Sequence, residues 1–127
     1  MLLAMNAKQQ RIKINKLERD GYEILDELGI QYKPQYLIAN KFCVDAFIPE
    51  RNIAVQFDGD YWHGHPEKFP NPDERQIRRM KLDRSQDAYL KKCGIRVIRI
   101  WESDVKKRRS QVRDMLQELI LGPATPA

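Results

Sequence analysis

The sequence predicts a single α/β domain in which a mixed four-stranded sheet is flanked by helices, in the order α-β-β-β-α-β-α. Three observations support this fold class. The chain has 127 residues, which is enough for one hydrophobic core. Three short apolar runs separated by tight turns lie between two long stretches with helical periodicity. A fourth apolar run follows the second helix directly, and such a crossover normally returns the chain parallel to an earlier strand.

The first predicted helix covers residues 8–28, because apolar side chains recur at helical spacing from Ile14 to Leu28. Gly29 is a natural helix stop, and Pro34 then breaks the chain. Glu18 lies on or beside the apolar stripe of this helix. Most glutamates on helices are solvated, but one at the inward-facing edge is a candidate for a functional site.

Three strands follow, and their tight turns favour an antiparallel meander. The expected strands cover residues 36–39, 42–48 and 53–58, with turns at residues 40–41 and 49–52. A loop rich in glycine, proline, histidine and aromatic residues comes next, at residues 59–72.

The second half of the chain predicts a helix, a strand and a last helix. The helix covers residues 73–93, with Asp73 or Asn71 as its N-cap and Gly94 as its stop, and the strand covers residues 95–101. Ser103 or Asp104 is expected to cap the last helix, over residues 103–121. The domain therefore covers residues 1–121, and residues 122–127 are expected to be a disordered tail.

Composition narrows the classes of function. Hydrophobic residues make up 42% of the chain and charged residues 32%, which excludes a disordered protein. The net charge of +5 indicates a polyanionic partner such as DNA, although a merely basic surface gives the same value. No apolar run approaches the roughly 18 residues that span a bilayer, so no membrane partner is expected. Cys43 and Cys93 do not form a CxxC pair and favour reduced thiols, which together indicates a cytoplasmic protein.

Carboxylates in two neighbouring strands are the first candidates for chemistry. Asp45 interrupts an apolar strand, which is costly unless its charge is paired or binds a metal. Gln56 and Asp58 share one face of the next strand, at its end. The short hairpin can bring Asp45 and Asp58 together, and two close carboxylates repel unless a cation lies between them. Backbone amides could satisfy either aspartate alone, but their joint placement favours Mg²⁺ or Mn²⁺ held by oxygen ligands.

The loop at residues 59–72 carries both histidines of the chain, His63 and His65. Histidine can take a proton near neutral pH and activate water for attack on phosphorus. No cysteine lies nearby to complete a zinc site, so structural zinc is not expected. Tyr61 and Trp62 precede His63, and two such aromatics either fill the core or stack on bases.

The second helix is strongly basic. A charge run is usually a solvated face, but phosphate contact is a sharper interpretation for the arginines near the loop. These candidates are Arg75, Arg78, Arg79 and Arg84. Asp83 interrupts the run, where it can orient His63 or pair with cations at helical spacing.

Two segments carry a resemblance to a known family. The runs VDAFIPERNIAVQFDGDYWHGHPEKF and KLDRSQDAYLKKCGIRVIRIWESDV resemble the very-short-patch repair (Vsr-type) endonucleases. They also resemble relatives in the PD-(D/E)XK superfamily, including Vsr-like phage homing endonucleases and DUF559-type nucleases. The resemblance extends over about residues 17–105 and implies a restriction-endonuclease-like fold. It also implies a Mg²⁺-dependent DNA endonuclease of bacterial or phage type, and a monomer would suit an enzyme that nicks one strand.

The resemblance also implies roles for individual residues. Asp45 matches a metal ligand, residues 56–58 match a second metal-binding element, and His63 matches a general base. The remaining matches are Glu18 and Asp83, which would position His63 or a metal-bound water, and Tyr61 and Trp62, which would insert into DNA.

Two departures from the family pattern limit what the resemblance implies. Gln56 stands where many relatives have glutamate, so the metal site has one negative charge fewer, unless Asp58 substitutes. A nuclease-fold DNA-binding module that no longer cuts is therefore an alternative, as are an RNA-processing nuclease and a basic protein-interaction domain. Asp60 stands where relatives have a zinc-binding cysteine, so neither the zinc nor the role in mismatch repair carries over.

Overall fold

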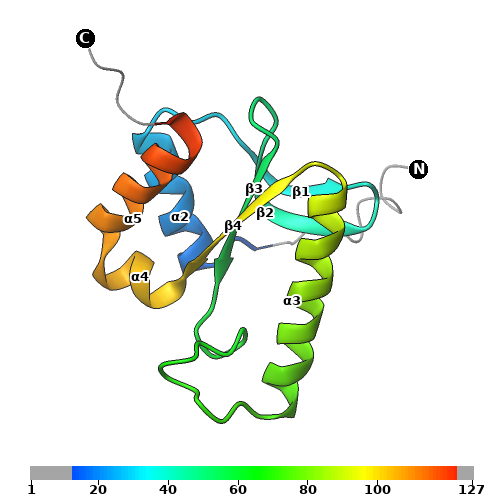
Figure 1. Ribbon diagram of the computed structural model, residues 1–127. Coiled ribbons are helices and arrows are strands. Elements are labelled where there is room, and N and C mark those ends of the chain that lie inside the picture. The colour runs from blue at the N-terminus through cyan, green and yellow to red at the C-terminus, as the bar shows by residue number, and fades with distance from the viewer. Residues whose placement is uncertain (1–12, 123–127) are drawn as a thin grey trace.

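The computed structural model describes residues 13–122, so the predictions for residues 8–12 and for the tail at residues 123–127 lie outside the described residues. The predicted fold class is confirmed: a mixed four-stranded sheet is flanked by helices (Figure 1). The elements are α2 (Lys16–Glu27), β1 (Lys33–Ile38), β2 (Phe42–Ile48), β3 (Ile53–Asp58), α3 (Glu74–Lys92), β4 (Arg96–Trp101), α4 (Glu102–Lys107), α5 (Arg109–Leu116) and a π-helical turn, η1 (Gln117–Leu121).

The sheet has the strand order β1-β2-β3-β4. The first three strands form the expected antiparallel meander, and β4 runs parallel to β3 after the crossover through α3. The helices α2, α4 and α5 gather on one side of the sheet, and α3 lies on the other (Figure 1). Within residues 13–122, no helix combines the length and the apolar character needed to cross a lipid bilayer.

Each face of the sheet has its own hydrophobic cluster. The larger cluster joins β3 and β4 to α2, α4 and α5, and includes Leu25, Val55 and Leu116. The smaller one lies under α3, where Leu90 packs against Val44 and neighbouring side chains. Because α3 buries only Gln76 and Leu90 among its 19 residues, most of this helix lies exposed beside the sheet.

The structure corrects several element boundaries. The first helix was expected over residues 8–28, but among the described residues it begins only at Lys16, because the preceding Asn15 is extended and caps it. β1 begins at Lys33 and contains Pro34, which was expected to break the chain. Proline is tolerated there because β1 is an edge strand, so the missing N–H removes no essential ladder bond. The hairpin turn after β1 has Ala39 and Asn40 at its centre, with φ of 52° and 54°, one residue earlier than expected.

The last helix is neither continuous nor capped as predicted. It begins at Glu102 and breaks at Arg108, whose φ of −132° and ψ of 43° are not helical. Ser103 cannot act as the cap, because its buried hydroxyl donates to the Asp60 carboxylate at 3.3 Å. A contact with a distant loop therefore overrides the local capping pattern: the N-cap residue Trp101 makes no side-chain cap bond, and the Asp60 carboxylate accepts the Ser103 N–H instead.

Candidate active site

The β2–β3 ladder is interrupted where the candidate carboxylates lie. Backbone pairing extends only from Ile48 and Ile53 to Ala46 and Val55. Beyond that point, the backbone N–H of Asp45 donates to the side-chain oxygen of Gln56 at 2.7 Å. The Asp45 carboxylate in turn accepts from the backbone N–H of Phe57 at 2.7 Å. Side chains thus replace the ladder bonds and hold the two strands in register at the site.

Helix α2 holds this end of the sheet from the other side. The Tyr22 hydroxyl donates to the backbone oxygen of Asp45 at 2.6 Å, within the core. Gly21 lets the ring of Phe57 approach the helix backbone, since a Cβ at this position would lie 2.3 Å from the ring. The backbone around Asp45 is therefore fixed by α2 as well as by β3.

Glu18 is buried, with 2% of its surface exposed, and forms a capping box with Asn15. The Glu18 N–H donates to Asn15 Oδ1 at 2.8 Å, and the Asn15 N–H donates to Glu18 Oε1 at 3.3 Å. The pattern Asn-x-x-Glu at the start of a helix is the sequence signal for this box, and our sequence analysis missed it. It explains why this glutamate faces inward rather than into solvent.

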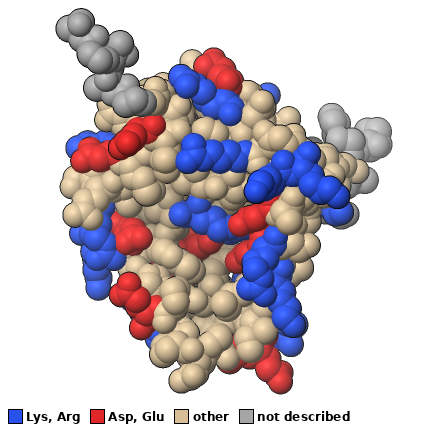
Figure 2. Space-filling model, viewed as in Figure 1, with Lys and Arg blue, Asp and Glu red and all other residues tan. Residues whose placement is uncertain are grey.

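A cleft of about 750 Å³ brings most of the predicted residues together. On the exposed face that Figure 2 shows, acidic side chains lie in the hollow, with lysine and arginine side chains beside them. The candidates that line the cleft come from α2, β2, β3, α3 and the loop after β3. They are Glu18, Asp45, Gln56, Asp58, Trp62, His63, Arg79 and Asp83.

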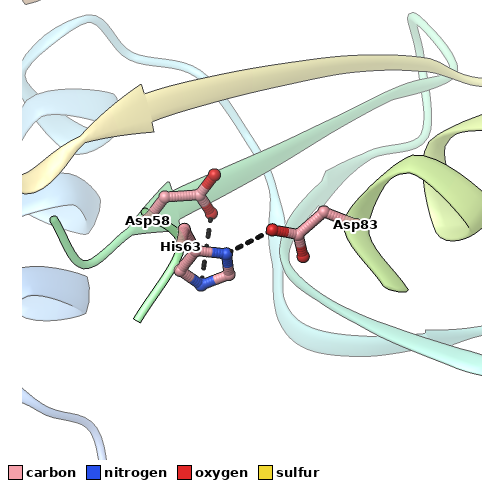
Figure 3. A group of neighbouring side chains, drawn as sticks. All are labelled: Asp58, His63 and Asp83. Carbon is pink, nitrogen blue, oxygen red and sulfur yellow. Dashed lines mark hydrogen bonds and ion pairs between the residues drawn. The ribbon is translucent and has the colours of Figure 1, made fainter. Parts of the chain in front are cut away.

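His63 lies between two carboxylates in this cleft (Figure 3). Its Nδ1 is 2.5 Å from Asp83 Oδ2, on α3, and its Nε2 is 3.7 Å from Asp58 Oδ1, at the end of β3. Ligand atoms of all three side chains lie within 4.8 Å of one another, so the group has the spacing of a metal site. In the tautomer whose Nδ1–H donates to the Asp83 carboxylate, Nε2 of His63 carries the lone pair and can accept a proton.

Arg99 is a member of this cluster that the sequence analysis missed. Its Nη1 donates to both oxygens of Asp58, at 3.0 and 3.1 Å, while Nε and Nη2 donate to Asp87. The sequence contains a signal for it, because Arg99 interrupts an apolar strand just as Asp45 does. Its register partner in β3 is Gln56.

The charges in this cluster act on one another. Burial raises the pKa of the Asp58 carboxyl above its ordinary value, although Arg99 and His63 oppose the shift. Burial disfavours the charge of Arg99, but the hydrogen bonds that Arg99 donates to Asp87 and the charges of Asp58 and Asp83 outweigh this effect and raise the Arg99 pKa. The guanidinium therefore stays charged and compensates the carboxylates around it.

The loop after β3 is anchored through Asp60. Its carboxylate accepts from the backbone N–H of Ser103 at 3.2 Å and from the Lys68 ammonium at 2.7 Å. Burial acts to raise the pKa of Asp60, but the bonds from Lys68 and Ser103 lower it overall. His65 is buried against Trp101, with ring centroids 4.6 Å apart. Protein contacts thus hold the Asp60 carboxylate, and the absence of structural zinc stays a prediction.

The two aromatics before His63 do not fill the core. Trp62 is 57% exposed at the edge of the cleft. Tyr61 is 37% exposed, and its hydroxyl donates to Asp73, the observed N-cap of α3, at 2.8 Å. Trp62 is therefore available to a ligand at the mouth of the cleft, and Tyr61, which does not line the cleft, lies beside it with ring centroids 5.2 Å apart.

The four candidate arginines of α3 are all exposed, but they differ in position. Arg79 lines the cleft, whereas Arg75, Arg78 and Arg84 do not. Within residues 13–122 none of the four forms an ion pair with a carboxylate, so their charges are available to a partner.

Comparison with known proteins finds similar enzymes both among curated proteins and among solved structures. The type II nicking enzyme V.NaeI from Lentzea aerocolonigenes is 29% identical over 134 aligned positions, which cover 96% of this chain and 81% of that enzyme. The catalytic domain of the homing endonuclease I-Bth0305I matches with a TM-score of 0.65 and 20% identity, over 88% of this chain and 100% of that domain. The chain therefore has a restriction-endonuclease-like α/β fold. No family model matches the sequence.

Within this fold, the donors in the cleft suit a hard divalent cation. Asp45, Gln56 and Asp58 present carboxylate and amide oxygens at the point where β2 and β3 separate. Mg²⁺ and Mn²⁺ prefer such oxygen ligands. The structure adds a protein partner for each aspartate, namely the Phe57 N–H for Asp45 and Arg99 for Asp58.

Proposed function

We propose that this protein is a divalent-metal-dependent DNA endonuclease that hydrolyses phosphodiester bonds and nicks one strand. The observation that carries the proposal is the placement of the His63–Asp83 pair beside Asp58, in the cleft that also contains Asp45. The similarity to a nicking enzyme and the endonuclease fold support the same reaction.

The metal would be Mg²⁺ or Mn²⁺, held by Asp45 and Asp58 with Gln56 beside them. When bound, it would supply positive charge that stabilises the charge developing on the phosphate oxygens. Glu18, buried at the start of α2, would help to orient water in the same cleft. Such an arrangement would correspond to a Vsr-like site in which glutamine takes the place of one acidic residue.

The residues of the chain would perform the proton transfer. Asp83 holds Nδ1 of His63, so that Nε2 faces Asp58 and the cleft. Nε2 would remove a proton from the attacking water, and the Asp83 carboxylate would stabilise the imidazolium that forms.

Binding of DNA would use the exposed groups around the cleft. Arg75, Arg78, Arg79 and Arg84 would contact backbone phosphates along α3. Tyr61 and Trp62 would contact bases at the mouth of the cleft. The net charge of +5 favours such a polyanionic partner and predicts that affinity falls with salt.

A plasmid-nicking assay tests the proposal. Supercoiled DNA is incubated with the parent protein, Asp45→Asn and His63→Ala, in Mg²⁺, Mn²⁺ or EDTA, with Lys91→Ala at the far end of α3 as a matched control. We expect metal-dependent nicking by the parent protein and Lys91→Ala, and a loss of about 100-fold or more in His63→Ala.

The outcomes separate this function from its alternative. Gln56 favours a nuclease-fold module that binds DNA without cutting, because the amide lacks the charge of the usual acid. DNA binding by a folded parent protein that never nicks would support that module. Full activity in either site variant would remove that residue from the mechanism.

A further inference from the structure

We propose that Arg99 is a positioning residue for the reaction, one that holds the carboxylates on both sides of His63 and fixes α3 against the sheet. This inference rests on the proposed function. It starts from an unusual convergence, because three aspartates from two elements meet one guanidinium on a third. Asp58 comes from the end of β3, Asp83 and Asp87 come from α3, and Arg99 comes from β4.

One nitrogen of Arg99 faces both carboxylates that flank the imidazole. Nη1 lies 3.0 and 3.1 Å from the two oxygens of Asp58 and 3.7 Å from Oδ1 of Asp83. The other oxygen of Asp83 contacts Nδ1 of His63. Arg99 therefore links the positions of Asp58 and Asp83. Because these carboxylates lie beside the two ring nitrogens of His63, Arg99 also fixes the surroundings of the imidazole.

The remaining nitrogens of Arg99 fasten this unit to α3. Nε donates to Asp87 Oδ2 at 2.9 Å, and Nη2 donates to Asp87 Oδ1 at 2.7 Å. Asp83 and Asp87 are one helical turn apart, so both face β4. The three nitrogens of the planar guanidinium can bind Asp58 and Asp87 at the same time, whereas a lysine ammonium cannot reproduce this geometry.

The helix needs such an anchor because its apolar contacts are few. Only Gln76, near its start, and Leu90, near its end, are buried in α3. The middle of the helix, which carries Asp83, is held to the sheet by the ion pairs of Arg99 with Asp83 and Asp87. The distance between His63 and its orienting carboxylate therefore depends on a residue that need not touch the substrate.

The test compares the 127-residue parent protein with Arg99→Lys and Asp87→Asn, and with Arg96→Lys as the matched control. Arg96 lies on the same strand but is exposed and outside the cleft. The readouts are single-turnover cleavage of a DNA duplex with Mn²⁺, affinity for the same duplex in EDTA, thermal unfolding, and the NMR signals of the His63 ring. Misplacement of a catalytic group by about 1 Å can cost about 100-fold in rate.

For Arg99→Lys we expect a folded protein with unchanged DNA affinity, a cleavage rate lowered by about 10- to 100-fold, and a shifted His63 Nδ1–H signal. Asp87→Asn should show a smaller change in the same two readouts, and Arg96→Lys should show none. A folded Arg99→Lys with the parent rate and the parent His63 signal would overturn the proposal.

Two further outcomes are also decisive. If Arg99→Lys does not fold, Asp87→Asn alone decides, because it removes only the outer anchor. An unchanged rate and an unchanged His63 signal in that variant would then overturn the proposal. If the parent protein does not cleave DNA, the proposed function fails, but the His63 signal still reports whether Arg99 positions the imidazole.

Discussion

The side-chain oxygen of Gln56 accepts the backbone N–H of Asp45 at 2.7 Å, so this glutamine performs a structural task at the centre of the candidate site. A glutamate could accept the same bond, but it would place a second negative charge beside the Asp45 carboxylate. The amide therefore keeps the strands together without that repulsion, and a metal ion meets one charge fewer.

Gln56→Glu should consequently lower the stability of the protein without metal and increase the stabilisation that metal provides. In EDTA, the buried like-charge pair should lower the free energy of unfolding by about 1–3 kcal/mol. Saturating Mn²⁺ should stabilise the variant more than the parent protein, because the added carboxylate strengthens the site. Thermal unfolding at matched metal concentrations measures both effects.

The control for this prediction is Gln111→Glu, at an exposed position on α5. It should respond to Mn²⁺ like the parent protein. An equal response to Mn²⁺ in Gln56→Glu and the parent protein would show that Gln56 does not belong to the metal site.

Arg79 and Arg78 are neighbours on α3, but only Arg79 lines the cleft. Arg79→Ala should therefore lower the single-turnover cleavage rate at saturating DNA, because a charge beside the reacting phosphate is lost. Arg78→Ala should weaken binding and reduce its salt dependence, with the saturated rate unchanged. Equal effects of the two substitutions on the rate would contradict the placement of Arg79.

Gly21 allows the close approach of α2 to Phe57, since a Cβ there would lie 2.3 Å from the ring. Gly21→Ala should lower the free energy of unfolding by about 1–3 kcal/mol through overpacking, although alanine favours a helix interior by about 1 kcal/mol. Urea unfolding measures the change. Adding Phe57→Leu should recover part of the loss, and a stabilised Gly21→Ala protein would show that this contact is not tight.

Asp60 links the loop after β3 to Ser103, and its pKa is lowered in the folded protein. A lowered carboxyl pKa adds stability above the ordinary value of 3.8, and this contribution disappears as the pH falls further through the folded-state value. Asp60→Asn should thus be less stable than the parent protein at pH 6, and the difference should shrink below about pH 3.8.

Urea unfolding at several pH values checks the Asp60 prediction. Asp114→Asn, at an exposed position on α5, is the matched control and should have little effect at either pH. A stability difference that stays constant into the acid range would mean that the charge of Asp60 is not what anchors the loop.

The sequence by itself determined the fold class, the order of the elements and the bounds of β2 and β3, because these follow from local periodicity and turn residues. It also singled out Asp45, because a charge inside an apolar strand needs an explanation wherever the strand lies. The same argument could have singled out Arg99, which was missed. Its partners Asp58 and Asp87 lie 41 and 12 positions away in the sequence, and no local pattern pairs them with Arg99.

Only the tertiary structure decided how the candidates are used. The start of α4 at Glu102 and the burial of Ser103 depend on the contact between Ser103 and Asp60, which local capping rules cannot foresee. The separation of Arg79 from Arg78 depends on how α3 docks on the sheet. Local patterns arise from neighbours along the chain, whereas the Arg99 cluster arises from the parallel register of β3 and β4, which forms only once the whole sheet is assembled.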